Sequence, residues 1–207
     1  MGPRLVKGMS TRKGTVVFLE DILNTAQSVM LDKLNQNSTG KLSEITNPSQ
    51  TADIIGLSGI MIQDFSAQRN KDYTFTWNKV TSFDGFTGAY LQYAHCRLAS
   101  LLDKNSDIPL LSNPDYSLLV ELEALILLDL ISKYQSVFSA SLHSLEPHRI
   151  VQYLFTLAQS IMQCHRGLKV KNTELHLAQV RKLLFTQSKQ ILSTGMKLLG
   201  LCPLERM

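Results

Sequence analysis

A short basic loop near the start of the chain has the composition of a phosphate-binding segment. It reads Gly8-Met9-Ser10-Thr11-Arg12-Lys13-Gly14, so two cations lie between glycines. Glycine lets the backbone close on a ligand, and the Arg12 guanidinium and the Lys13 ammonium can neutralise phosphate oxygens. Apolar residues 15–19 follow, and they predict a strand before an acidic helix start. The loop is therefore either a site for a ligand that carries phosphate groups or a solvated turn, since short basic glycine loops are also common as turns.

The elements that must position this loop are mainly helices. Three- and four-residue apolar spacing predicts helices near residues 19–35, 47–65, 87–102, 116–138, 146–167 and 173–199. Asn47 followed by Pro48 is a typical helix start, and Gly200 is a typical stop. Residues 73–77 alternate aromatic and polar side chains, which predicts a short strand or an extended segment.

We therefore expect a mainly α chain in two parts. Residues 1–82 form a small mixed segment that holds the loop and connecting helices, and residues 83–207 form an antiparallel α-helical bundle.

Composition sets broad limits on function. The 207 residues carry a net charge of +4 and are 44% hydrophobic, so an RNA partner is allowed but not required. The three cysteines, Cys96, Cys164 and Cys202, are far apart, and neither they nor the histidines have the spacing of metal ligands. No apolar run approaches the ~20 residues of a membrane span, and the N-terminus lacks the apolar core of a secretory signal. We expect a protein that is not secreted, with no bound metal in its own site.

The loop resembles the second signature loop of class I aminoacyl-tRNA synthetases, and most closely that of the arginyl enzymes. The family pattern Lys-Met-Ser-Lys-Ser reads here Gly-Met-Ser-Thr-Arg, at residues 8–12. The resemblance implies that the loop binds ATP, with Mg²⁺ accompanying the nucleotide, through Lys7, Met9, Ser10 and Arg12. It also implies a catalytic role in adenylation for Met9, Ser10, Thr11, Arg12 and Lys13. Because Thr11 replaces the second lysine of the pattern, we expect Lys7, Arg12 or Lys13 to stabilise the developing charge on pyrophosphate.

A second segment resembles the opening of the anticodon-binding domain in the arginyl enzymes, where Tyr-x-Gln-Tyr-Ala-x-x-Arg is typical. Here it runs from Tyr90 through Gln92 and Tyr93 to Arg97. The two tyrosines are one turn apart on one helix face, an arrangement that is also common in a packed core. The resemblance implies that both rings line the anticodon pocket, where unpaired bases stack on aromatic side chains. Gln92 and Arg97 either support the helix, reach phosphate, or are simply solvated or salt-bridged.

The end of the chain carries the third part of the resemblance. Residues 145–158 resemble a family helix that opens Glu-Pro-His, and the ending Gly-Met-Lys-Leu-Leu-Gly…Arg-Met is similar to the family terminus. The resemblance implies that Met207 contacts tRNA. His165 stands where the family has an aromatic residue that faces the anticodon, and it is either a weaker stacking surface or a plain surface histidine. Arg181 could contact the tRNA backbone or form an internal ion pair, and we expect the internal ion pair.

The resemblance covers essentially the whole chain, which is identified as the C-terminal region of an arginyl-tRNA synthetase of the fungal and mitochondrial type. The first signature, His-x-Gly-His, is absent, so we expect this chain alone to be inactive. The full enzyme would be a monomer that uses arginine, ATP and tRNA(Arg) in the mitochondrial matrix or the cytoplasm. The alternative is a truncated, non-catalytic tRNA- or RNA-binding helical module. A related class I enzyme of the cysteinyl type and a plain helical interaction protein are further alternatives.

Overall fold

The computed structural model describes residues 17–36, 45–111 and 113–207, and these residues form helices but no strand. The helices are α1 (Leu19–Gln36), α2 (Pro48–Phe65), α3 (Trp77–Thr81), α4 (Gly88–Lys104), α5 (Leu122–Ser132), α6 (Tyr134–Ser144), α7 (His148–Gly167) and α8 (Leu175–Leu198), with a short 3₁₀ helix η3 (Tyr116–Leu118) before α5. The expected mainly α class is confirmed. None of the described helices is both long and apolar enough to cross a membrane.

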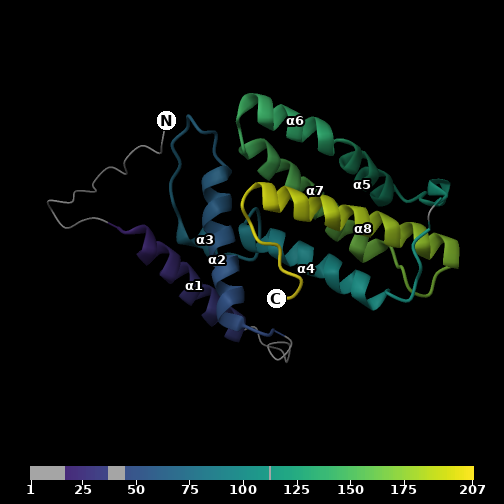
Figure 1. Cartoon of the computed structure of the whole chain (residues 1–207), viewed down its shortest axis with the longest axis horizontal. Coiled ribbons are helices and arrows are strands. Elements are labelled where there is room, and N and C mark those ends of the chain that lie inside the picture. The colour runs from purple at the N-terminus through teal and green to yellow at the C-terminus, as the bar shows by residue number, and fades with distance from the viewer. Residues whose placement is uncertain (1–16, 37–44, 112) are drawn as a thin grey trace.

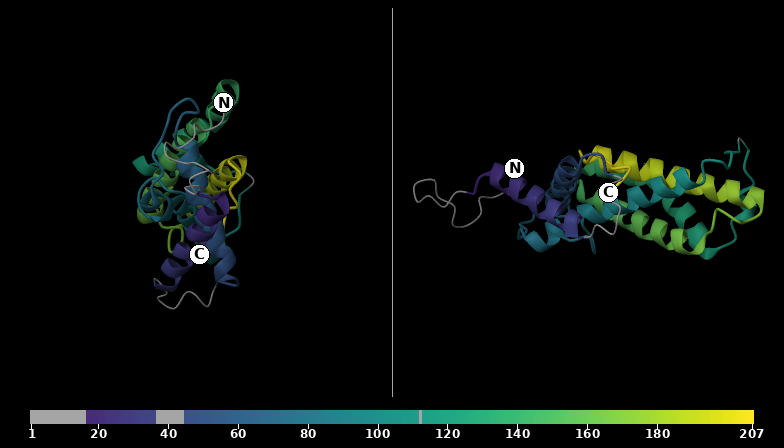
Figure 2. Two further views of the ribbon diagram at one scale, coloured as in Figure 1. Left: turned by 90° about the vertical axis from the view of Figure 1, so that its left-hand side faces the viewer. Right: turned by 90° about the horizontal axis from the view of Figure 1, so that it is seen from below.

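The helices form an elongated molecule with an antiparallel pair at one end and a bundle along the rest (Figures 1 and 2). Helices α1 and α2 make the pair, and α2 packs on the beginning of α4. The bundle is built from α4, α7 and α8, and α5 and α6 lie along α7. After α8 the last residues cross the first half of α4 toward the α1–α2 pair (Figure 1).

Two apolar cores hold this arrangement. The large one fills the bundle, and its largest fully buried side chains include Leu91, Leu98, Leu154, Ile161, Phe185 and Leu192. The small one lies where the α1–α2 pair meets α4 and contains Met30, Leu34, Ala52, Ile55 and Ala89. We call the second group the junction core.

The contact between α2 and α4 depends on a glycine at the first residue of α4. A Cβ added to Gly88 would lie 2.2 Å from the backbone C and O atoms of Ser58. Thr87 precedes this glycine and caps α4, since its hydroxyl accepts a hydrogen bond from the Tyr90 N–H at 3.1 Å. The start of α4 is therefore fixed both by its own cap and by the backbone of α2.

The sequence signals for helix ends are confirmed. The Asn47 side chain accepts from the Gln50 N–H at 3.1 Å, and Pro48 occupies the first turn of α2. Gly200 has a φ of 80°, and the Leu201 N–H donates to the Met196 carbonyl at 3.0 Å, which closes α8 in the manner of a Schellman motif.

The expected strands do not form in the part of the chain that the structure describes. Residues 15 and 16 lie outside the described ranges, and Leu19 already begins α1. Residues 73–76 belong to no helix or strand there, and the backbone of Thr76 is extended, so the predicted strand does not form. Side chains hold them on α2 instead: the Tyr73 hydroxyl donates to Asp64 Oδ1 at 2.9 Å, and the Gln63 amide donates to the Thr74 carbonyl at 3.2 Å.

The single helix expected at residues 116–138 is wrong. The Asp115 carboxylate accepts from both the N–H and the hydroxyl of Ser117, which stabilises the isolated turn η3. A second break lies between α5 and α6, where the hydroxyls of Ser132 and Ser136 donate to backbone carbonyls. Such local hydrogen bonds compete with the regular helical ladder. Helix α6 then continues to Ser144, beyond the predicted end.

Candidate nucleic-acid interface

One face of α4 carries two tyrosines and two cations. Tyr90, Tyr93, Arg97 and Lys104 follow one another at steps of three, four and seven residues, which places them on one side of the helix. Tyr93 and Lys104 are exposed, whereas Tyr90 and Arg97 are half-buried. The Arg97 guanidinium carbon lies 5.9 Å from the centre of the Tyr93 ring, within range of a cation–π interaction.

The end of α7 adds a histidine and an arginine to this face. Burial lowers the pKa of His165, and the positive charges of Arg97 and Lys104 lower it further. The imidazole is therefore mostly neutral at pH 7, and His165 is half-buried. Burial raises the pKa of the Tyr90 hydroxyl, while the charge of Arg166 partly opposes that rise, so Arg166 acts on Tyr90 across the α4–α7 contact.

We call these six side chains the α4–α7 face: Tyr90, Tyr93, Arg97, Lys104, His165 and Arg166. It combines three cations with three rings, the combination that binds single-stranded nucleic acid by charge and by stacking. The structure thus brings together three residues that the sequence nominated: Tyr90, Tyr93 and His165. Arg166 and Lys104 were not predicted, although Lys104 follows Arg97 by two helical turns.

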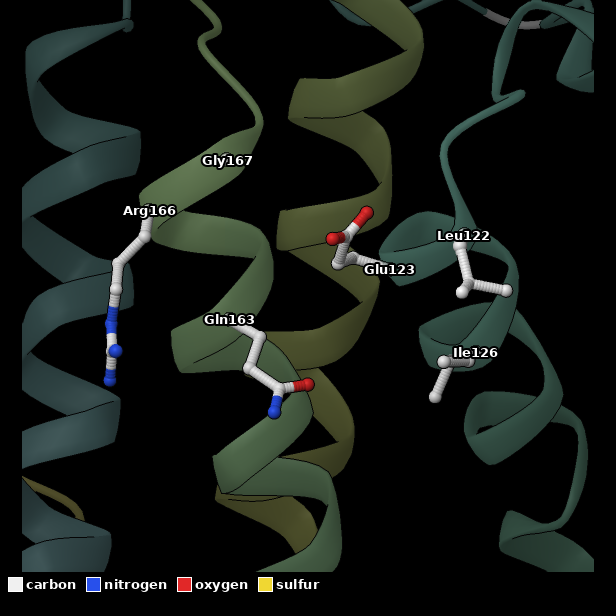
Figure 3. A pocket seen from close by; sticks show the side chains of 6 residues that line it. All are labelled: Leu122, Glu123, Ile126, Gln163, Arg166 and Gly167. Atoms are coloured by element: carbon white, nitrogen blue, oxygen red, sulfur yellow. The ribbon is translucent and has the colours of Figure 1, made fainter.

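A shallow pocket of about 530 Å³ adjoins this face at the junction of α5 and α7. Figure 3 shows Leu122, Glu123 and Ile126 on α5, and Gln163 and Arg166 on α7, with Arg166 turned away from the two apolar side chains and running alongside the neighbouring helix. The pocket therefore shares Arg166 with the α4–α7 face.

The fourth nominated tRNA contact, Met207, packs at the junction core and is not one of the side chains of the α4–α7 face. It is half-buried and packs, together with Leu204, against the junction core. That core contains Ala89, which precedes Tyr93 by one helical turn. The end of the chain is therefore seated next to the α4–α7 face rather than within it.

Two further polar residues have internal roles. Arg181 pairs with Glu121 and donates to the Lys169 carbonyl at 2.6 Å, which confirms the expected internal ion pair. Gln92 is completely buried and cannot reach a phosphate. Of the roles that the sequence left open for Gln92, the structure supports the internal one.

The loop residues with the expected ATP and catalytic roles lie outside the described residues: Lys7, Met9, Ser10, Thr11, Arg12 and Lys13. Within the described ranges, no three His, Cys, Asp or Glu side chains gather in a way that could hold a metal ion.

Comparison with known protein families gives two matches that together span most of the chain. Residues 91–207 match the family model of the DALR anticodon binding domain. Residues 3–77 match the model of the catalytic domain of class I tRNA synthetases of the arginine type.

Relatives match nearly the whole chain, but the chain spans only about a third of their length. A probable cytoplasmic arginine–tRNA ligase of Dictyostelium discoideum is 49% identical over 203 residues, which is 98% of this chain and 34% of the relative. The mitochondrial arginine–tRNA ligase of Saccharomyces cerevisiae is 40% identical over 205 residues, which is 98% of this chain and 32% of that relative. Among solved structures, the arginyl-tRNA synthetase of Thermus thermophilus has the same fold, with a TM-score of 0.82 and 23% identity over 93% of this chain and 32% of that chain.

Proposed function

The chain belongs to the DALR anticodon-binding family of the arginyl-tRNA synthetases, and from this premise we propose that its helical bundle binds tRNA(Arg) at the anticodon. The bundle would act as part of an arginine–tRNA ligase, which charges its tRNA with arginine at the expense of ATP. The observation that carries the proposal is the α4–α7 face, because its rings and cations match the chemistry of an unpaired RNA loop.

Each part of the face has a distinct role in the proposal. The Tyr93 ring is exposed and stacks on an anticodon base, and Tyr90 and His165 extend the stacking surface. Arg97, Lys104 and Arg166 neutralise phosphates and bring the RNA to the face. Met207 contacts the anticodon loop from its place at the junction core.

We also propose a role for the N-terminal loop in the whole ligase. Lys7, Met9, Ser10 and Arg12 bind ATP together with Mg²⁺, and residues 9–13 assist adenylate formation. The match of residues 3–77 to a class I catalytic domain supports this assignment. Relatives occur in both cytoplasm and mitochondria, and the proposal places the ligase, as a monomer, in one of these two compartments.

The test replaces Tyr93 with alanine and measures binding of the chain to tRNA(Arg) by fluorescence anisotropy. If the ring stacks on a base, Tyr93→Ala weakens binding by ~1–3 kcal/mol. The matched control is Tyr116→Ala, since Tyr116 is also exposed but belongs to η3, which packs on α8 rather than on the α4–α7 face.

A second RNA completes the experiment. The same tRNA with its central anticodon bases replaced should bind the parent chain more weakly and should be insensitive to Tyr93→Ala. Equal affinity of the parent chain for both tRNAs would leave only nonspecific attraction to phosphate and would reject anticodon recognition.

A further inference from the structure

The last residues of the chain run back across α4 and are held there by a buried side-chain amide. The Gln92 Nε2 group donates to the Cys202 carbonyl at 2.9 Å, and Gln92 Oε1 accepts from the Leu204 N–H at 2.9 Å. One glutamine thus satisfies a backbone acceptor and a backbone donor of the tail, much as a neighbouring strand would. The same Nε2 also donates to Ser58 Oγ on α2 at 2.9 Å, so Gln92 joins α2, α4 and the tail.

The next turn of α4 holds the other backbone group of Leu204. Its carbonyl accepts from His95 Nδ1 at 2.7 Å and from Cys96 Sγ at 3.1 Å. Because a carbonyl only accepts, His95 carries its proton on Nδ1. Both backbone groups of Leu204 are therefore bound by side chains of α4, which fixes the register of the tail. We call Gln92, His95 and Cys96 the tail clamp.

Charge pairs at the surface add little to this attachment. Lys189 and Glu205 are 2.6 Å apart, and Arg206 lies 3.7 Å from Asp103, but one or both partners in each pair are exposed. Exposed ion pairs contribute little to stability, whereas a buried amide that loses its hydrogen-bond partners is costly. The tail clamp, not the surface pairs, decides where the end of the chain lies.

We propose that Gln92 is a positioning residue for anticodon recognition: through the tail clamp it keeps Met207 seated against the junction core, which includes Ala89, one turn of α4 before Tyr93. The inference rests on the proposed function of the α4–α7 face. Gln92 is fully buried and does not touch the RNA; it acts on recognition through the tail. A chain end that is not tied down frays, and the tRNA would then have to order it on binding.

The first experiment follows the tail itself by amide hydrogen exchange in the parent chain and in Gln92→Leu. Leucine has a similar size but neither hydrogen bond, so exchange at the Leu204 N–H should speed up roughly tenfold. The Leu201 N–H, which donates to the Met196 carbonyl at the end of α8, should keep its protection. Ser58→Ala is the matched control, because it removes the third hydrogen bond of Gln92 and leaves both bonds to the tail.

The second experiment measures discrimination, the ratio of affinities for tRNA(Arg) and for the same tRNA with replaced central anticodon bases. Gln92→Leu should lower this ratio roughly tenfold, and so should truncation of the chain after Cys202. If Gln92 acts through the tail, the two changes together should do no more than either one alone. The truncated chain keeps α4 intact, so it also tests the tail if Gln92→Leu folds poorly.

The outcomes separate the two proposals. A parent chain that binds both tRNAs equally would reject the proposed function and the recognition role of Gln92 with it. Full discrimination in a Gln92→Leu chain whose Leu204 N–H has lost protection would reject the positioning role alone. So would a Gln92→Leu effect that persists in the truncated chain, because the glutamine would then act by another route.

Discussion

At the scale of single residues, His95 on α4 and His165 on α7 have depressed pKa values for related reasons. Burial lowers the pKa of His95 most strongly, and the charges of Lys189 and Lys197 add to it, although Glu205 and the hydrogen bond to Leu204 oppose the change. His165 is less buried, and there the cations of the α4–α7 face assist. Both imidazoles are therefore mostly neutral at pH 7, and in this form His95 holds the Leu204 carbonyl through Nδ1.

The depressed pKa of His95 predicts a loss of stability in mild acid. The unfolded chain takes up a proton near pH ~6.5, while the folded chain resists it, so the unfolded state binds more protons below that pH. The stabilisation is complete above pH ~6.5 and declines as the pH falls toward the folded pKa. Urea unfolding between pH 7.5 and 5.5 should show this decline, and it should be smaller in His95→Gln, which keeps an N–H donor but cannot take up the proton.

Carboxylates with lowered pKa values do not account for a loss of stability between pH 7.5 and 5.5. The pKa values of Glu121 and Glu146 are lowered, so their contribution to stability is lost only below their ordinary pKa of about 4.5. They do not contribute within the measured window. An identical decline in the parent chain and in His95→Gln would show that the titrating group is not His95.

At the scale of elements, a helix end could be predicted from the sequence where a single residue type marks it. Asn47 and Gly200 act through their own backbone or the next turn, so their roles are visible in the sequence. The break between α5 and α6 was not predictable, because the apolar pattern continues across it and only the serine hydroxyls mark it. Residues 73–77 have strand-like alternation, but within the described ranges they find no strand to pair with. Tyr73 and Thr74 are hydrogen-bonded to side chains of α2 instead, and Trp77 begins α3.

The close approach of α2 and α4 gives a prediction at this scale. Gly88→Ala adds a methyl group 2.2 Å from the Ser58 backbone, and backbone cannot move aside as a side chain can. We expect a loss of at least ~2 kcal/mol in the free energy of unfolding, even though alanine is the better helix former. The measurement is the urea midpoint and slope of the variant beside the parent chain.

Gly167→Ala is the matched change on α7. A Cβ at Gly167 meets nothing within 4 Å, so this variant should lie between no change and a gain of about 1 kcal/mol. Equal stability of the two variants would mean that α2 and α4 are not packed as closely as described.

At the scale of the whole molecule, the candidate site was only partly predictable. Tyr90 and Tyr93 lie in one short motif, and so they could be nominated from the sequence. Arg166 lies near them only because α7 packs beside α4. The spacing of residues along the sequence does not predict that contact. The tail clamp could not be predicted from the sequence either, because Gln92 and Leu204 are 112 residues apart.

The packing of α7 beside α4 also brings the cations of the α4–α7 face together. Their contribution to RNA binding can be measured from the salt dependence of the binding constant. Each cation that neutralises a phosphate makes the logarithm of the binding constant fall more steeply with the logarithm of salt concentration. Arg166→Gln should therefore weaken binding to tRNA(Arg) and reduce that slope by ~0.7–1. Arg149→Gln makes the same change of charge on an exposed arginine at the opposite end of α7, and it should leave the slope nearly unchanged. If both variants lowered the slope equally, the RNA would be attracted by the overall charge of the chain, and the α4–α7 face would not be its specific contact.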